Sequence, residues 1–205
     1  GVAFLESTRV TGLDADRDRV RVTARVDEYD HEVSADHVVL ATGSPILDRG
    51  WLSTRMEAHR SYLCAFTVTP SADGSSVLPD GMFMSADGPG RSVRTATVDG
   101  GGVLLVGGSG HRTGASGDER DHVAELTAWT QEHFPGAIRT HAWSAQDHHP
   151  AGGLPRVEAL PHGHGRIIAA GGYSKWGMTS APAAARMAAD LVLGRESELS
   201  FGAAG

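Results

Sequence analysis

Residues 167–182 read Ile-Ile-Ala-Ala-Gly-Gly-Tyr-Ser-Lys-Trp-Gly-Met-Thr-Ser-Ala-Pro, and this stretch decides the fold. The short apolar run at 167–170 predicts a strand that two glycines end. Thr179 or Ser180 is the expected N-cap of a following helix, Pro182 suits its first turn, and Gly194 is the expected stop. The pattern therefore predicts a strand, a glycine turn and a helix rich in small residues.

A strand that feeds a glycine turn and a helix places free backbone N–H groups at the positive end of the helix dipole. Such a turn suits a phosphate, a carboxylate or an electron-rich carbonyl. The alternative is that the glycines only permit a tight turn, since short glycine motifs often match by chance. On the pattern alone, both interpretations stay open.

The composition is that of a globular chain, with 205 residues, 40% hydrophobic and 21% charged residues. A net charge of -7 disfavours nucleic-acid and anionic-membrane partners, because both need clustered Lys and Arg, and Lys175 is the only lysine. No apolar run approaches the roughly 20 residues of a membrane span. The single cysteine, Cys64, excludes an internal disulfide and a cysteine-held zinc or iron–sulfur centre within these residues. We expect a cytoplasmic location.

The first 43 residues predict an antiparallel meander followed by a buried strand. Segments 9–13 and 19–26 predict a hairpin around the turn 14–18, and 31–35 predicts a third strand. The run Val-Val-Leu-Ala at 38–41 is apolar on both faces, which is typical of the middle of a covered sheet. Because the chain starts with a strand-like segment and no methionine, we expect it to be the later part of a longer protein.

Residues 51–150 predict one antiparallel sheet with a covering helix. The expected helix is Asp118–Phe134, which Pro135 and Gly136 end. The glycine-rich segment 107–114 is expected to be a loop, since it lacks the Lys-Ser/Thr ending of a phosphate-binding loop, and 141–150 is also expected to be a loop. Asp99-Gly100 is the expected hairpin turn. The four expected strands are 62–69, 81–85, 92–98 and 102–107.

Five histidines between positions 141 and 164 raise the possibility of a metal site, because imidazole is a common ligand of transition metals. Their spacing is irregular and no pair stands at i and i+4 of a predicted helix, so we expect no functional metal site. These histidines are His141, His148, His149, His162 and His164.

The segment Val-Val-Leu-Ala-Thr-Gly at 38–43, which follows the meander, resembles the second nucleotide-contacting segment of FAD-dependent oxidoreductases. With the antiparallel insert and the Lys-Trp-Gly-Met-Thr motif at 175–179, the order of motifs resembles the C-terminal two thirds of the glycine/D-amino-acid oxidase (DAO) family. The motif at 175–179 is most similar to the branch whose longer members carry a Rieske domain.

The resemblance implies a mixed α/β (α+β) fold. Residues 1–51 and 151–205 would form part of a Rossmann-like FAD-binding domain, and 52–150 an inserted antiparallel substrate domain. No Gly-x-Gly-x-x-Gly follows a first strand, so the N-terminal dinucleotide-binding unit is expected to be missing. We therefore expect that the isolated chain does not hold FAD tightly.

The resemblance also implies where FAD would lie. The N–H groups of residues 177–179 would lie near the flavin pyrimidine carbonyl, where a helix N-terminus stabilises the negative charge of the reduced ring. Lys175 is either a cation beside the flavin or a surface lysine, and both interpretations stay open. The implied cofactor-binding residues are Thr42, Gly43, Gly171, Gly172, Lys175, Trp176, Gly177, Met178 and Thr179.

The residues that would contact a substrate are less defined. Tyr173 and Trp176 could wall a substrate pocket or pack under the turn. Arg94 and Arg156 could clamp a carboxylate, or could be ordinary exposed arginines. No catalytic residue is identified from the sequence.

The expected function is that of an FAD-dependent oxidoreductase that removes a hydride from a C–N bond of a small amine or amino acid. A nicotinamide-using flavoprotein reductase is an alternative, since it shares the Ala-Thr-Gly strand. A truncated, non-catalytic binding module is a second alternative. Its exposed sheet edge would favour oligomers.

Overall fold

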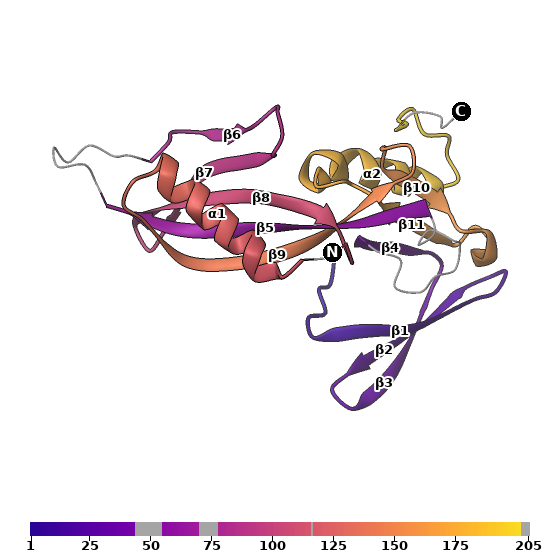
Figure 1. Ribbon diagram of the computed structural model, residues 1–205. Helices are drawn as coiled ribbons and strands as arrows, with labels where there is room; N and C mark the ends of the chain where they lie inside the picture. The colour runs from indigo at the N-terminus through magenta and orange to yellow at the C-terminus, as the bar shows by residue number, and fades with distance from the viewer. Residues whose placement is uncertain (44–54, 70–77, 116, 202–205) are drawn as a thin grey trace. The chain divides into compact units, whose positions relative to one another are not determined.

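The computed structural model describes residues 1–43, 55–69, 78–115 and 117–201 (Figure 1). The chain divides into two compact units, Gly1–Glu57 with His148–Gly205, and Ala58–Asp147. The chain thus leaves the first unit, forms the second and returns. No helix in the described part combines the length and the apolarity that a membrane span needs.

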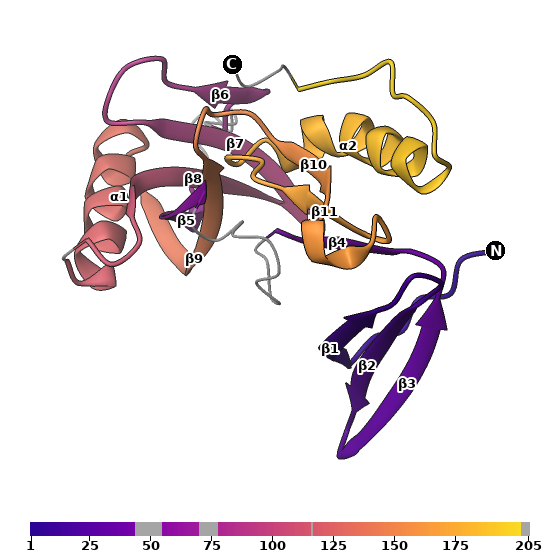
Figure 2. The same cartoon turned by 90° about the vertical axis from the view of Figure 1, so that its right-hand side faces the viewer.

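The first unit begins with the meander that the sequence predicts. Strands β1 (Thr8–Ala15), β2 (Val20–Val26) and β3 (Tyr29–Ala35) pair antiparallel in the order β1-β2-β3 (Figure 2). Asp16 fixes the first turn, because its Oδ1 accepts the N–H of Asp18 at 2.7 Å and of Arg19 at 2.8 Å. These hydrogen bonds lower the pKa of the Asp16 carboxyl.

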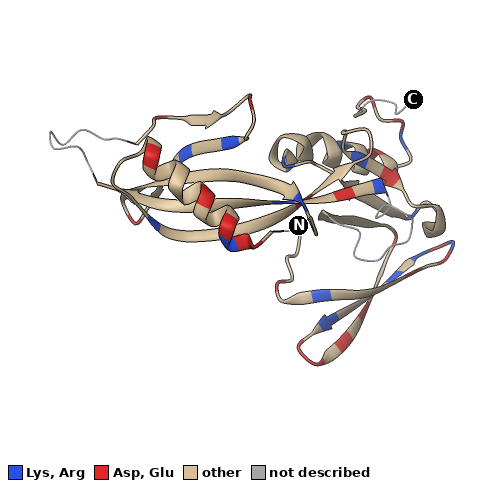
Figure 3. Ribbon diagram, viewed as in Figure 1, with Lys and Arg blue, Asp and Glu red and all other residues tan. Residues whose placement is uncertain are grey.

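Exposed ion pairs join neighbouring strands of the meander, where basic and acidic positions adjoin (Figure 3). Arg21 lies 3.2 Å from Asp14, and Arg25 lies 2.8 Å from Asp30. Exposed pairs of this kind contribute little to stability. The meander depends more on Leu13 and Val20, which are buried in the core of the first unit.

A second sheet of the first unit has the order β10-β11-β4, from Arg156–Ala159, Ile167–Gly171 and Val38–Gly43. β11 pairs parallel with β4 and antiparallel with β10. The predicted strand at 167–170 is confirmed, and Ile167 and Ile168 are fully buried. The expectation that β4 lies in the middle of a covered sheet is wrong for the described residues: β4 has one partner strand there, and Val39 is 44% exposed. β10 was not predicted.

Helix α2 (Gly177–Val192) begins earlier than the sequence suggests. Its N-cap is Trp176, so the expected cap at Thr179 or Ser180 is wrong, and the Ser180 N–H already donates to the Trp176 carbonyl at 2.9 Å. Pro182 consequently lies inside the helix. The stop at Gly194 is consistent with its left-handed φ of +63°. Ala184 and Ala188 are buried where α2 packs against β10 and β11.

The second unit is a five-stranded sheet in the order β6-β7-β8-β5-β9. The pairs β6–β7, β7–β8 and β8–β5 are antiparallel, and the expected turn at Asp99-Gly100 joins β7 to β8. The first two residues of β5 and the last three of β9 belong to the first unit. The strands are β5 (Met56–Val68), β6 (Met82–Met84), β7 (Arg91–Val98), β8 (Gly101–Arg112) and β9 (Ala137–Pro150).

Two segments expected to be loops are strands. β8 continues through the glycine-rich segment to Arg112, where Gly108 pairs with both Tyr62 and Arg91. A Cβ on Gly107 would lie 2.6 Å from the Ser92 Oγ, and one on Gly108 would lie 2.7 Å from the Gly90 carbonyl oxygen. These glycines therefore permit close packing across the sheet. The segment 141–150 is part of β9, an edge strand whose polar composition hid it.

Helix α1 (Glu119–His133) covers one face of this sheet, as predicted (Figure 1). Asp118 is its N-cap, and its Oδ1 accepts the Arg120 N–H at 2.9 Å. Leu126 is fully buried against a core cluster formed with β5 and β8. The cluster includes Tyr62, Cys64, Phe66, Leu104 and Val106.

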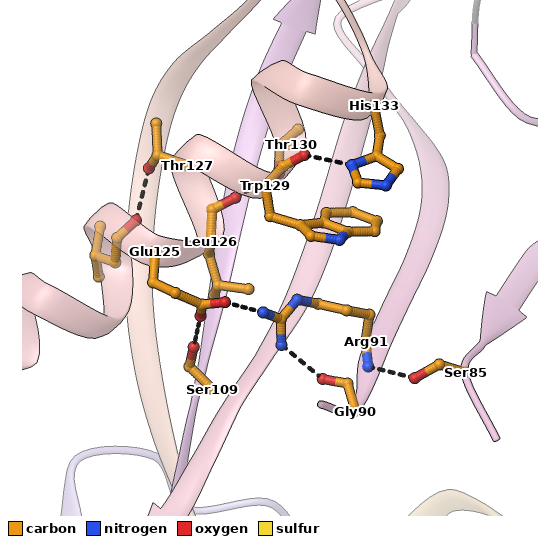
Figure 4. A network of polar contacts seen from close by, with 11 residues as sticks. Ser85, Gly90, Arg91, Ser109, Glu125, Leu126, Thr127, Trp129, Thr130 and His133 are labelled. Carbon is orange, nitrogen blue, oxygen red and sulfur yellow. Dashed lines mark hydrogen bonds and ion pairs between the residues drawn. The ribbon is translucent and has the colours of Figure 1, made fainter. Parts of the chain in front are cut away.

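A buried arginine also holds α1 on the sheet (Figure 4). Arg91 is 6% exposed, and its guanidinium donates to the Glu125 carboxylate and, at 3.1 Å, to the Gly90 carbonyl oxygen. The other oxygen of Glu125 accepts the Ser109 hydroxyl. The Arg91 guanidinium lies 5.7 Å from the centre of the Trp129 ring, a cation–π distance. One carboxylate of α1 thus joins β7 and β8.

Replacing Glu125 with Gln tests this network. Glu125→Gln leaves the buried Arg91 charge without its counter-charge, so we expect the free energy of unfolding to fall by about 2 kcal/mol. Glu132→Gln is the matched control, since Glu132 is exposed on the same helix and makes no ion pair in the described part of the chain. Chemical denaturation measures both variants. Equal stability of the two variants would contradict a structural role for the network.

Candidate functional site

The turn between β11 and α2 has an unusual backbone. Gly172 has φ +75°, and two residues that are not glycine, Ser174 at +48° and Lys175 at +74°, also lie in the left-handed region. Each such residue costs about 1 kcal/mol or more, and such strain collects at functional sites. Left-handed residues in a turn also direct successive N–H groups into a concavity that can hold an anion.

The start of α2 supplies further unsatisfied donors. The N-cap residue Trp176 makes no side-chain capping hydrogen bond. The N–H groups of Gly177, Met178 and Thr179, in the first turn, therefore have no acceptor within the helix. They lie at the positive end of the helix dipole. An acceptor-rich group bound at this point would satisfy them.

Ser174 is a candidate that sequence reasoning missed. Its N–H donates to the His148 carbonyl oxygen at 3.3 Å, while its buried Oγ has no hydrogen-bond partner among the described residues. A buried hydroxyl without a partner is costly, so a polar ligand beside it would stabilise the turn. The only signal of such a role in the sequence is the position of Ser174 in a glycine turn, between Tyr173 and Lys175.

The structure brings the end of β4 next to the end of β11. Gly43 has φ +71° and pairs with Gly171 after a register shift that follows Ala169, and a Cβ on Gly171 would lie 3.4 Å from the Gly43 carbonyl oxygen. Thr42 is exposed at the same strand end. On the other side of β11, the half-buried Arg156 pairs in register with Gly171. Residues far apart in sequence thus meet at the turn before α2.

The side chains of the turn differ in exposure. Trp176 is 56% exposed and Met178 is 94% exposed, so neither packs into the core of the described residues. Tyr173 is half-buried, and burial raises the pKa of its hydroxyl, which therefore stays protonated at neutral pH. Lys175 is exposed and makes no ion pair in the described part of the chain.

Arg94 belongs to the second unit. It is exposed on β7. Arg91 and Val93 of the same strand face α1, and Arg94 lies an odd number of residues from both. Arg94 therefore projects from the sheet face that α1 leaves uncovered. Met82 of the neighbouring strand β6 pairs with Arg94 and is 85% exposed, so a cation and an apolar side chain are neighbours there. The described residues contain no group of three or more His, Cys, Asp or Glu that could hold a metal ion.

The family model for FAD dependent oxidoreductases (DAO) matches residues 1–191. A Bacillus subtilis (strain 168) protein named as a Rieske 2Fe-2S iron-sulfur protein, YhfW, is 29% identical over 167 residues. That match covers 81% of this chain and 32% of the relative.

Solved structures of the same fold have low sequence identity. L-Proline dehydrogenase from P. horikoshii gives a TM-score of 0.71 at 16% identity, covering 96% of this chain and 52% of that one. Glycine oxidase from Geobacillus kaustophilus gives a TM-score of 0.67 at 17% identity, covering 95% of this chain and 50% of that one. The mixed α/β fold is thereby confirmed. The chain spans about a third of the curated relative and about half of these structures.

The turn itself can be tested at Gly172. A Cβ there would lie 3.1 Å from Pro150 and would also force an L-residue to φ +75°, so we expect Gly172→Ala to lower the free energy of unfolding by about 2 kcal/mol or more. Gly194→Ala is the control: φ is +63° but no atom lies within 4 Å, so the loss should be about 1 kcal/mol. If the two variants lose the same stability, the close contact with Pro150 is not a constraint.

Proposed function

Because the chain belongs to the FAD dependent oxidoreductase family, whose model matches residues 1–191, we propose that the whole protein oxidises a C–N bond of a small amine or amino acid. FAD is the cofactor of this family. When bound, FAD supplies the acceptor for the hydride. Glycine oxidase and L-proline dehydrogenase share the fold and are named for amino acids, which supports this substrate class.

One observation carries the proposal: the left-handed turn before α2 ends in an uncapped helix N-terminus. Its unsatisfied N–H groups and the buried Ser174 Oγ fit a cofactor edge rich in acceptors. The N-terminal end of α2 would stabilise negative charge on that edge, which favours reduction. The residues proposed to contact FAD are Thr42, Gly43, Gly171, Gly172, Lys175, Trp176, Gly177, Met178 and Thr179.

The domain assignment follows from the same proposal. Residues 1–51 and 151–205 would contribute to FAD binding, and 52–150 would contribute the substrate surface. In the second unit, the exposed Arg94 beside Met82 suits an amino acid with an apolar side chain. Arg94 would bind the carboxylate, and Met82 would contact the side chain. Arg156, half-buried beside Gly171, is a second candidate for the carboxylate.

The charge of the helix N-terminus can be tested at Thr179, which is exposed in the first turn of α2. Thr179→Asp adds a favourable helix-dipole interaction of about 0.5 kcal/mol. The same negative charge would oppose charge on the reduced cofactor, so the rate of flavin reduction by substrate should fall about tenfold. Anaerobic bleaching of the flavin absorbance, in protein from the whole reading frame, measures this rate.

Thr179→Asn is the matched neutral control and should reduce flavin at close to the original rate. Equal rates in the Asp and Asn variants would contradict the placement of the cofactor at this helix end. Loading with FAD is checked first by titration. Reduction by a nicotinamide but by no amine would instead support a flavoprotein reductase, and absence of flavin would support a binding module.

Substrate binding is tested at Arg94. Arg94→Gln should raise KM for an amino acid about tenfold or more, because a charge-assisted pair with the carboxylate is lost. In Arg94→Gln, the KM for the corresponding amine, which lacks the carboxylate, should be unchanged. Arg94→Lys should restore part of the affinity for the amino acid. A KM that rises equally for both substrates would contradict the assigned role.

A further inference from the structure

A groove of about 470 Å³ lies within the second unit, between the start of α1 and β9. Tyr62 belongs to the core cluster under α1, so the groove is on the helix-covered side of the sheet, opposite to Arg94. The polar and aromatic residues that line it are Tyr62, Glu119, Arg120, Arg139, Trp143 and Ser144, and its other lining side chains are small and apolar.

The groove has an excess of free positive donors. Arg120 makes no side-chain hydrogen bond or ion pair in the described part of the chain, and Arg139 uses one nitrogen, which donates to the Thr127 Oγ1 at 2.9 Å. The only acidic residue in its lining, Glu119, is already paired with Arg60 at 3.2 Å. Acidic and basic positions adjoin at this end of α1 (Figure 3).

Tyr62 lines the groove and carries a buried donor. The residue is 3% exposed, and its hydroxyl has no hydrogen-bond partner among the described residues. Its ring is fixed by stacking, with centroids 5.0 Å from His122 and 5.8 Å from His111. Burial and the nearby Glu119 charge raise the pKa of the hydroxyl, so it remains a neutral donor near pH 7. A buried donor without a partner is costly, so an acceptor from outside the described residues would stabilise it.

We propose that this groove binds a small carboxylate with an apolar body. Arg120 and Arg139 would hold the carboxylate, with the Tyr62 hydroxyl as a further donor. The apolar body would contact Trp143, which is 46% exposed, and the small apolar side chains beside it. The site is independent of the proposed oxidation, because none of its residues belongs to the flavin or Arg94 regions.

Phenylacetate is a suitable probe, and phenylacetamide is its uncharged control. Calorimetric titration of the protein from the whole reading frame should give saturable binding of phenylacetate with a Kd of about 1 mM or tighter. Arg120→Gln and Arg139→Gln should each raise this Kd about tenfold, and phenylacetamide should bind at least tenfold more weakly.

Arg94→Gln separates this site from the candidate substrate surface and should leave the Kd unchanged. Loss of binding in Arg94→Gln but not in the Arg120 and Arg139 variants would overturn the proposal, as would equal binding of the amide. Neither outcome depends on FAD or on turnover. The groove proposal can therefore fail while the proposed oxidation stands, and the proposed oxidation can fail while the groove proposal stands.

Tyr62→Phe distinguishes a ligand-binding hydroxyl from a merely structural one. Without ligand, removal of a buried unpartnered hydroxyl should leave the thermal midpoint unchanged or raise it, while the Kd for phenylacetate rises about fivefold. A lower midpoint with an unchanged Kd would show that the hydroxyl serves the fold alone and would overturn its assigned role.

Discussion

The parallel pairing of β11 with β4 is the constraint on which the first unit and its site depend. Ile167 pairs with Val38, so the whole second unit intervenes in sequence between the two strands. Closing so long a connection has an entropic cost that grows only slowly with length. Burial of Ile167, Leu40 and Leu160 in one cluster offsets it, since each fully buried side chain contributes about 1.5–3 kcal/mol.

The same pairing determines where the chemistry can occur. The pairing of Gly43 with Gly171 sets the two strand ends level, and the turn before α2 starts directly after Gly171. The strain of this turn and its unsatisfied donors lower stability in the absence of a ligand. Such costs persist only where the surrounding structure over-determines the conformation. Here the buried strand β11 and the buried alanines of α2 provide that support from both sides.

Local patterns in the sequence were sufficient for elements whose own residues carry the signal. The apolar run at 167–170, the meander and the amphipathic helix Asp118–Phe134 are in this class. β9, β10 and the end of β8 were missed, because edge position and close strand packing select polar residues and glycine there. The start of α2 was misplaced because no capping side chain marks it. Ser174 and the groove under α1 depend on side chains from separate elements, which no local pattern reveals.

Strand β7 connects the stability of the second unit with its candidate substrate surface. Arg91 and Arg94 are three residues apart, so in a strand they face opposite sides of the sheet. A register slip of one residue would move Arg94 toward the core under α1 and Arg91 to the uncovered face. Glu125 opposes that slip, because its carboxylate binds the Arg91 guanidinium where Gly108 leaves space for it. The ion pair on the covered face therefore fixes which arginine the uncovered face presents.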